Sequence, residues 1–168
     1  MKRILSLVVV ITSFCLCSLE TAAQDVHVPK NYSLETSSDY RANAPAVKKC
    51  LEWLLETPLH EYPDKRAEVN AFVMLWLTGT PTLTIETNSS LMPFIEKNEE
   101  LFYTFVHALT LYHIKHKEIE AQADIEFALT EVIRMYRRSK DLEKDDEMKE
   151  LRRARRWGKL DEWIQKHS

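Results

Sequence analysis

Glycine is almost absent from this chain, and its scarcity is the strongest constraint on the fold. Only two glycines occur in 168 residues, Gly79 and Gly158. Between Phe94 and Trp157 the sequence contains neither glycine nor proline. Tight β-hairpins and bulges depend on glycine, because its backbone adopts positive φ without a steric penalty. The sequence therefore predicts an all-α fold.

The spacing of apolar residues predicts where the helices lie, because such residues recur at intervals of three and four. We expect helices over 45–56, from Pro63 or Asp64 to about Gly79, from Asn98 to about 113, over about 121–136 and over 146–157. A short helix capped by Asn88 or Ser89 should reach Lys97. A final turn or two after Gly158 should fold back. The alternation in residues 82–87 predicts at most one short extended segment.

Short loops between these helices imply antiparallel helical hairpins, which form either a small bundle or a short solenoid. Several residues fall at spacings found in 34-residue helix-turn-helix repeats, in which small side chains let paired helices approach. They are Phe105, Tyr112, Ala121, Ile125 and Ala128. No second copy follows at that period. The pattern thus indicates a weakly repeat-like style of packing.

Residues 1–23 have the features of a secretory signal peptide. Lys2 and Arg3 precede an apolar run, and Thr21-Ala22-Ala23 places small residues before a cleavage point after Ala23. A retained membrane anchor is the alternative, but it needs about twenty apolar residues. A lipoprotein signal around Cys15 or Cys17 is a third interpretation. We expect an exported protein, periplasmic or secreted, that begins at Gln24.

The remainder of the chain divides into two parts. Residues 24–43 are polar and are expected to form a flexible arm, and residues 44–168 have the length of one helical domain. Cys50 is the only cysteine beyond the signal, so no internal disulfide can form. Small extracellular domains of animals usually rely on several disulfides, and their absence favours a bacterial envelope protein.

The charges are distributed unevenly along the chain. Residues 24–133 carry 9 Lys plus Arg against 17 Asp plus Glu, whereas residues 134–168 carry 12 against 8. An acidic body is therefore followed by a basic C-terminal segment, with the basic helix in 146–168. Nucleic acid is not expected as a partner, because the isoelectric point is near 6.1 and the protein is exported.

The basic segment supplies the candidate interaction residues. They are Lys149, Arg152, Arg153, Arg156, Trp157 and Trp163. Such a helix could meet a protein partner, or lie on an anionic membrane with tryptophan at the headgroups and arginine on phosphates. The alternative is an ordinary surface helix whose arginines pair with Glu147, Glu150, the turn at 145–146 or the acidic body.

Two further patterns are candidates for chemistry. His113, His116 and Glu120 could place three zinc ligands on neighbouring turns, but cationic side chains are also favoured at a helix C-terminus. Cys50 could act as a nucleophile near Lys48 and Lys49, although its apolar helical neighbours indicate a core residue. Neither pattern implies a cofactor.

No catalytic motif is present: the chain lacks H-E-x-x-H, G-x-S-x-G, a phosphate loop and a dinucleotide fingerprint. The expected function is that of an exported interaction module of the cell envelope with a protein partner. Association with an anionic membrane surface through the basic helix is the alternative. A hydrolase or metal-binding protein is the third interpretation.

Overall fold

The computed structural model describes residues 26–81, 83, 85, 88–116, 118, 120 and 122–168. The expected signal peptide lies outside these residues. The α-helices are α1 (Ser37–Glu56), α2 (Pro63–Gly79), α3 (Glu100–Lys115), α4 (Ala123–Arg138), α5 (Asp146–Arg156) and α6 (Leu160–His167), with 3₁₀ turns η1 (Ser89–Leu91) and η2 (Pro93–Glu96). The described ranges contain no strand, so the all-α prediction is confirmed. None of these helices is long and apolar enough to cross a membrane.

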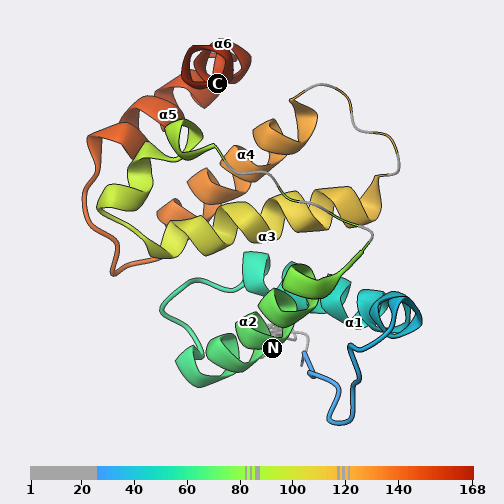
Figure 1. Cartoon of the computed structure of the whole chain (residues 1–168). Helices are drawn as coiled ribbons and strands as arrows, with labels where there is room; N and C mark the ends of the chain where they lie inside the picture. Colours follow the sequence, from blue (N-terminus) through green and yellow to red (C-terminus); the bar gives the residue numbers. More distant parts are fainter. Residues whose placement is uncertain are drawn as a thin grey trace, which may run out of the picture.

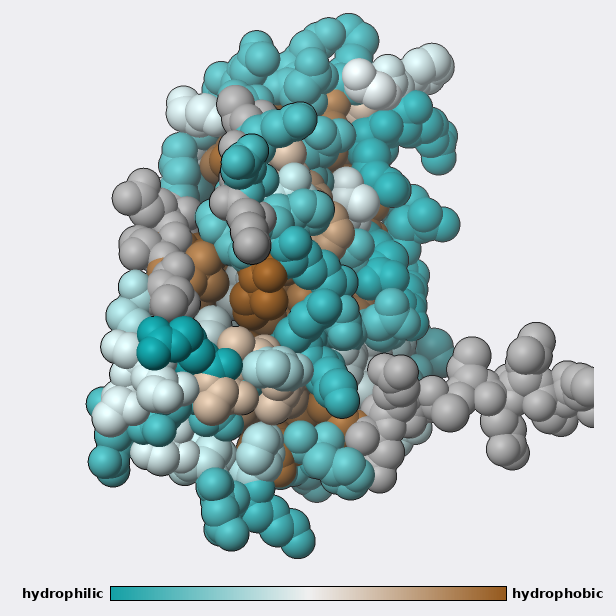
Figure 2. Space-filling view, turned by 90° about the vertical axis from the view of Figure 1, so that its right-hand side faces the viewer, coloured by the Kyte–Doolittle hydropathy of each residue, from teal (hydrophilic) through white to brown (hydrophobic). Residues whose placement is uncertain are grey.

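The helices form a small bundle in which α3 occupies the middle (Figure 1). Helices α1 and α2 pack together on one side of α3, and α4 packs along the other side. Helices α5 and α6 contact each other and both contact α4. On the face in Figure 2, hydrophilic side chains cover the upper part, and apolar ones show mainly at mid-height and below. The basic segment of the sequence therefore lies at one end of the bundle, beyond α4.

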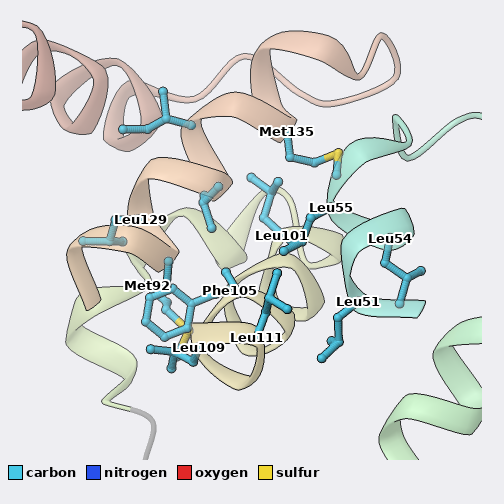
Figure 3. Close-up of a cluster of buried hydrophobic side chains, with 14 of the residues drawn as sticks. Leu51, Leu54, Leu55, Met92, Leu101, Phe105, Leu109, Leu111, Leu129 and Met135 are labelled. Atoms are coloured by element: carbon cyan, nitrogen blue, oxygen red, sulfur yellow. The ribbon is translucent and has the colours of Figure 1, made fainter. Parts of the chain in front are cut away.

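One hydrophobic core joins these layers. Figure 3 shows leucines of α1 and apolar residues of α4 around α3, whose Leu101 and Phe105 lie between them. The same cluster includes three residues of α6, Leu160, Trp163 and Ile164. The last helix is thus part of the core and not an appendage.

Helix α1 begins earlier than expected, at Ser37 instead of Pro45, which corrects the boundary of the predicted arm. Thr36 and Asp39 form a capping box, in which each side chain accepts a hydrogen bond from the other residue's backbone N–H. Pro45 lies inside α1 and leaves the Arg41 carbonyl without its helical donor. At the neighbouring residue, the indole of Trp76 donates to the Tyr40 carbonyl at 2.9 Å, which ties the first turns of α1 to α2.

The two glycines serve different purposes. A Cβ atom on Gly79 would lie 1.8 Å from the Tyr40 hydroxyl oxygen, so a larger residue at position 79 would force the Tyr40 side chain to shift. Gly158 has a φ of +65° and separates α5 from α6. The expected break at Gly158 and the return of the last helix are therefore confirmed.

The segment between α2 and α3 differs from expectation in detail. Leu83 and Ile85 are partly buried against the core but lie in no strand, and residues 82, 84, 86 and 87 are outside the described set. Asn88 caps as expected, but it begins the first of two 3₁₀ turns in place of one helix. Asn98 is not the cap of α3, because its side chain turns toward the α4–α5 loop.

Candidate interaction surface

Helix α5 is positioned by its cap and by two apolar anchors. The Asp145 carboxylate accepts a hydrogen bond from the Glu147 amide at 2.9 Å, which fixes the first turn. Met148 and Leu151 are buried in the core. Because a helix turns by 100° per residue, burying these two directs Arg152 and Arg156 to the solvent side. The local sequence thus determines which face of α5 is exposed.

The exposed face of α5 and the end of α4 border a basic groove of about 730 Å³. We call it the basic groove, and its lining residues are Ile133, Arg137, Lys149, Arg152, Arg153, Arg155, Arg156 and Trp157. Five arginines and one lysine thus share the groove with no carboxylate. The Trp157 side chain is 70% exposed. Of the predicted interaction residues, Lys149, Arg152, Arg153, Arg156 and Trp157 are brought together here.

The arginines of the basic groove do not pair with acidic residues in the way the alternative interpretation required. No described carboxylate lies within 4.0 Å of any of these five guanidinium groups. In this groove only Lys149 has an acidic neighbour, Asp146 at 3.8 Å. Pairs such as Arg152 and Arg156 are four residues apart on one helix, where like charges repel. The groove therefore holds positive charge that is not neutralised within the described part of the chain.

Trp163 does not line the basic groove, although it borders the adjoining hollow between α5 and α6 with Lys149, Arg153 and Trp157. Its side chain is only 4% exposed, and its ring stacks on His167 with centroids 3.9 Å apart. An apolar ring at this position gains more from the core of the bundle than from solvent. The surface therefore presents one tryptophan, Trp157, and not two.

Arg137 and Arg155 belong to the groove but were absent from the predicted set. Arg137 lies on α4, fifteen residues before Arg152 and next to the basic Arg138. Arg155 falls on the side of α5 that the helical spacing assigns toward the core, yet it lies near the helix end and is exposed. Spacing along one helix identifies neither residue, because both depend on how α4 and α5 meet.

The candidate metal ligands are not assembled into a site. His113 lies 3.0 Å from the Asp124 carboxylate through Nε2, which links the end of α3 to the start of α4. The His116 ring stacks on Tyr112 with centroids 4.2 Å apart, and Glu120 is exposed beyond the helix. Among the described residues no group of three or more His, Cys, Asp or Glu is placed to hold a metal ion.

Cys50 lies in the core and is poorly suited to nucleophilic chemistry. The residue is fully buried on α1. Burial raises the pKa of the Cys50 thiol to about 11. Because the thiolate is the reactive form, this thiol is unreactive near neutral pH. The interpretation of Cys50 as a small core residue is the one that its surroundings favour.

Comparison with known proteins adds no further constraint. No family model matches the chain, and no curated protein or solved structure is significantly similar to it. The functional argument therefore rests on the geometry of the surface.

Proposed function

We propose that this chain is an exported interaction module that docks an acidic segment of a protein partner in the basic groove. One observation carries the proposal: five arginines and one lysine line a single groove that contains no carboxylate. Guanidinium groups bind carboxylates through paired hydrogen bonds, which are stronger than bonds between neutral groups. An acidic partner would supply the negative charge that the described residues do not.

Trp157 supplies an apolar contact at the same place. Its exposed ring lies beside Arg153 and Arg156 in the groove lining. Tryptophan and arginine are the residue types that most often dominate the binding energy of protein interfaces. A partner segment with acidic residues around one apolar side chain would therefore match the groove best.

An anionic membrane surface is the second candidate, and the exposure of Trp157 next to arginines is the observation that favours it. Tryptophan inserts at the headgroup level while arginine binds lipid phosphates. With Trp163 buried, however, a single aromatic anchor remains. We therefore rank the acidic protein segment first.

Titration with polyglutamate and sedimentation with phosphatidylglycerol vesicles test the two candidates. We expect saturable polyglutamate binding that weakens by at least about tenfold between about 0.05 and 0.5 M salt, because salt screens exposed charges. The triple variant Arg152→Glu, Arg153→Glu, Arg156→Glu should lose this binding. The matched control Lys30→Glu, Arg41→Glu, Lys49→Glu changes three exposed cations outside the groove and should retain it.

Two outcomes would count against the first candidate. Equal loss of binding in both triple variants would mean that net charge, not the groove, attracts polyglutamate. Sedimentation with vesicles without binding of polyglutamate would favour the membrane.

The proposed export has its own test, which is the mass of the protein isolated from the cells that make it. Cleavage of residues 1–23 should give a chain that begins at Gln24. A chain that still carries Lys2 and Arg3 would contradict cleavage and would favour a retained anchor.

A further inference from the structure

The basic groove has a neighbour on the other side of α5. This second depression lies between α5 and residues 159–166, and we call it the α5–α6 hollow. Its volume is about 540 Å³, within the range of about 300–1,000 Å³ that is usual for ligand sites. Three residues line both the groove and the hollow: Lys149, Arg153 and Trp157. Because they follow one another at intervals of four, they form a ridge along α5 that is about 12 Å long.

The hollow differs from the basic groove in its charge. Each of its three carboxylates lies within 4.0 Å of a lysine nitrogen. The pairs are Lys149 with Asp146 at 3.8 Å, Lys159 with Glu162 at 3.1 Å, and Lys166 with Glu150 at 3.8 Å. The remaining cation is Arg153, which also lines the basic groove and has no described carboxylate within 4.0 Å. The hollow therefore favours an uncharged side chain, whereas the basic groove favours carboxylates.

The hollow also has apolar surface, which comes from two tryptophans and an alanine. Trp163 is 4% exposed and Trp157 is 70% exposed. Ala154, which is partly buried against the core, lines the hollow but not the basic groove. Aromatic rings favour edge-to-face or offset contact with one another, and such pairs contribute beyond the area that they bury. An aromatic side chain is thus the best occupant of this hollow.

The spacing of the arginines in the basic groove matches an extended peptide. Arg152 and Arg156 lie one turn apart on α5, which corresponds to about 6 Å along the helix axis. In an extended chain, side chains two residues apart lie about 7 Å from each other and point to the same side, whereas the residue between them points to the opposite side. A peptide lying along the ridge could therefore direct two carboxylates into the groove and the residue between them into the hollow.

We infer that the acidic partner segment binds in extended form along this ridge, with an aromatic residue between two acidic ones. The carboxylates pair with Arg152 and Arg156 in the basic groove, and the aromatic ring enters the α5–α6 hollow beside Trp157. The inference rests on the proposed function and adds the sequence pattern of the partner.

Two blocked heptapeptides test this pattern by calorimetric titration of the unmodified protein. Both contain six glutamates, and the central residue is phenylalanine in one peptide and alanine in the other. Burial of the ring predicts that the phenylalanine peptide binds at least about tenfold more tightly. The comparison uses two peptides of equal charge, so attraction between net charges does not contribute to the difference.

Two pairs of variants separate the groove from the hollow. Arg152→Glu with Arg156→Glu should abolish binding of both peptides, whereas Arg41→Glu with Lys49→Glu on α1 should not. Ala154→Leu fills part of the hollow and should reduce the affinity of the phenylalanine peptide to that of the alanine peptide, which should itself be unchanged. Ala67→Leu, on the exposed side of α2, should leave both affinities unchanged. Circular dichroism would confirm that the variants remain folded.

The contrary outcomes are distinct for the inference and for the proposed function. Equal affinity for the two peptides, with both lost in the double arginine variant, would overturn the inference and leave the proposed function standing. An advantage of phenylalanine that survives in Ala154→Leu would place the ring outside the hollow and would also overturn the inference. Absence of saturable binding of either peptide up to about 1 mM would count against both.

Discussion

The buried imidazole of His107 makes the stability of this protein depend on pH. The side chain lies on α3 and is only 3% exposed, and its Nε2 atom has no hydrogen-bond partner among the described residues. Burial, and secondarily the positive charge of Arg66, lowers the pKa of His107 to about 3. The imidazole is therefore neutral in the folded protein under most conditions.

We expect His107→Leu to reduce the acid sensitivity of folding. Below its ordinary pKa of 6.5 the unfolded chain binds a proton at this residue, whereas the folded protein does so only near pH 3. In the unmodified protein, His107 should therefore lower the free energy of unfolding by roughly 1 kcal/mol per pH unit as the pH decreases below about 6.5, and it should contribute no pH dependence above that value. The His107→Leu variant should lack this slope. Urea unfolding at pH 7 and pH 5 measures this slope. His116→Leu, at an exposed position, is the control, and equal slopes for the two variants would contradict the assignment.

Asn98 connects the start of α3 to the α4–α5 loop. The residue is 1% exposed, its amide oxygen accepts from the Glu143 N–H at 2.8 Å, and its amide nitrogen donates to the Glu143 carbonyl at 3.3 Å. Asn98→Ala leaves both backbone groups without this partner and should lower the free energy of unfolding by about 1–3 kcal/mol. Thermal unfolding measures the loss. Asn31→Ala, on the surface, should change stability by less than about 0.5 kcal/mol, and a similar small effect at Asn98 would contradict the role of this connection.

At the scale of single elements, the sequence predicts some boundaries well and others poorly. Proline in the first turn and glycine at the end identify α2, and its observed bounds agree with them. The start of α1 was missed because Pro45 resembles a first-turn proline, although the capping box of Thr36 and Asp39 is a local signal that lies further upstream. Where two local signals compete, spacing alone does not decide which residue begins the helix.

Helix α5 combines exposed like charges with a proposed binding face. We therefore expect that replacing one of these charges by a carboxylate raises the stability of the protein and weakens its binding. Arg152 has Lys149 three residues before it, and Arg155 and Arg156 three and four residues after it. Arg152→Glu would turn three repulsive pairs into attractive ones and should raise the free energy of unfolding by about 1–3 kcal/mol. The same change should weaken binding of polyglutamate. Thermal unfolding at low salt measures the first effect, and a less stable variant would contradict the view that these arginines are unpaired.

At the scale of the whole molecule, a single core reaches from α1 to α6. Trp163→Ala would remove a buried ring from this core and should lower the free energy of unfolding by about 3–5 kcal/mol. Trp157→Ala removes an exposed ring of the same type and should change stability by less than about 0.5 kcal/mol. Chemical unfolding of the two variants provides the comparison. Equal effects would contradict the assignment of Trp163 to the core.

The packing of the whole molecule also explains which features of the candidate surface the sequence could not predict. Spacing along α5 was sufficient to select Arg152, Arg153 and Arg156, because they share one face of one helix. The contribution of Arg137 and the burial of Trp163 depend on how α4, α5 and α6 pack, which no local pattern records. The α5–α6 hollow was missed for the same reason, because its residues come from two helices.

The position of α6 in the core has a consequence for the order of events when the protein is made. Leu160, Trp163 and Ile164 complete a cluster that begins with residues of α1, so the cluster cannot close until synthesis has passed residue 164. Until then the partly synthesised chain lacks the α6 side of its hydrophobic core and remains loosely folded.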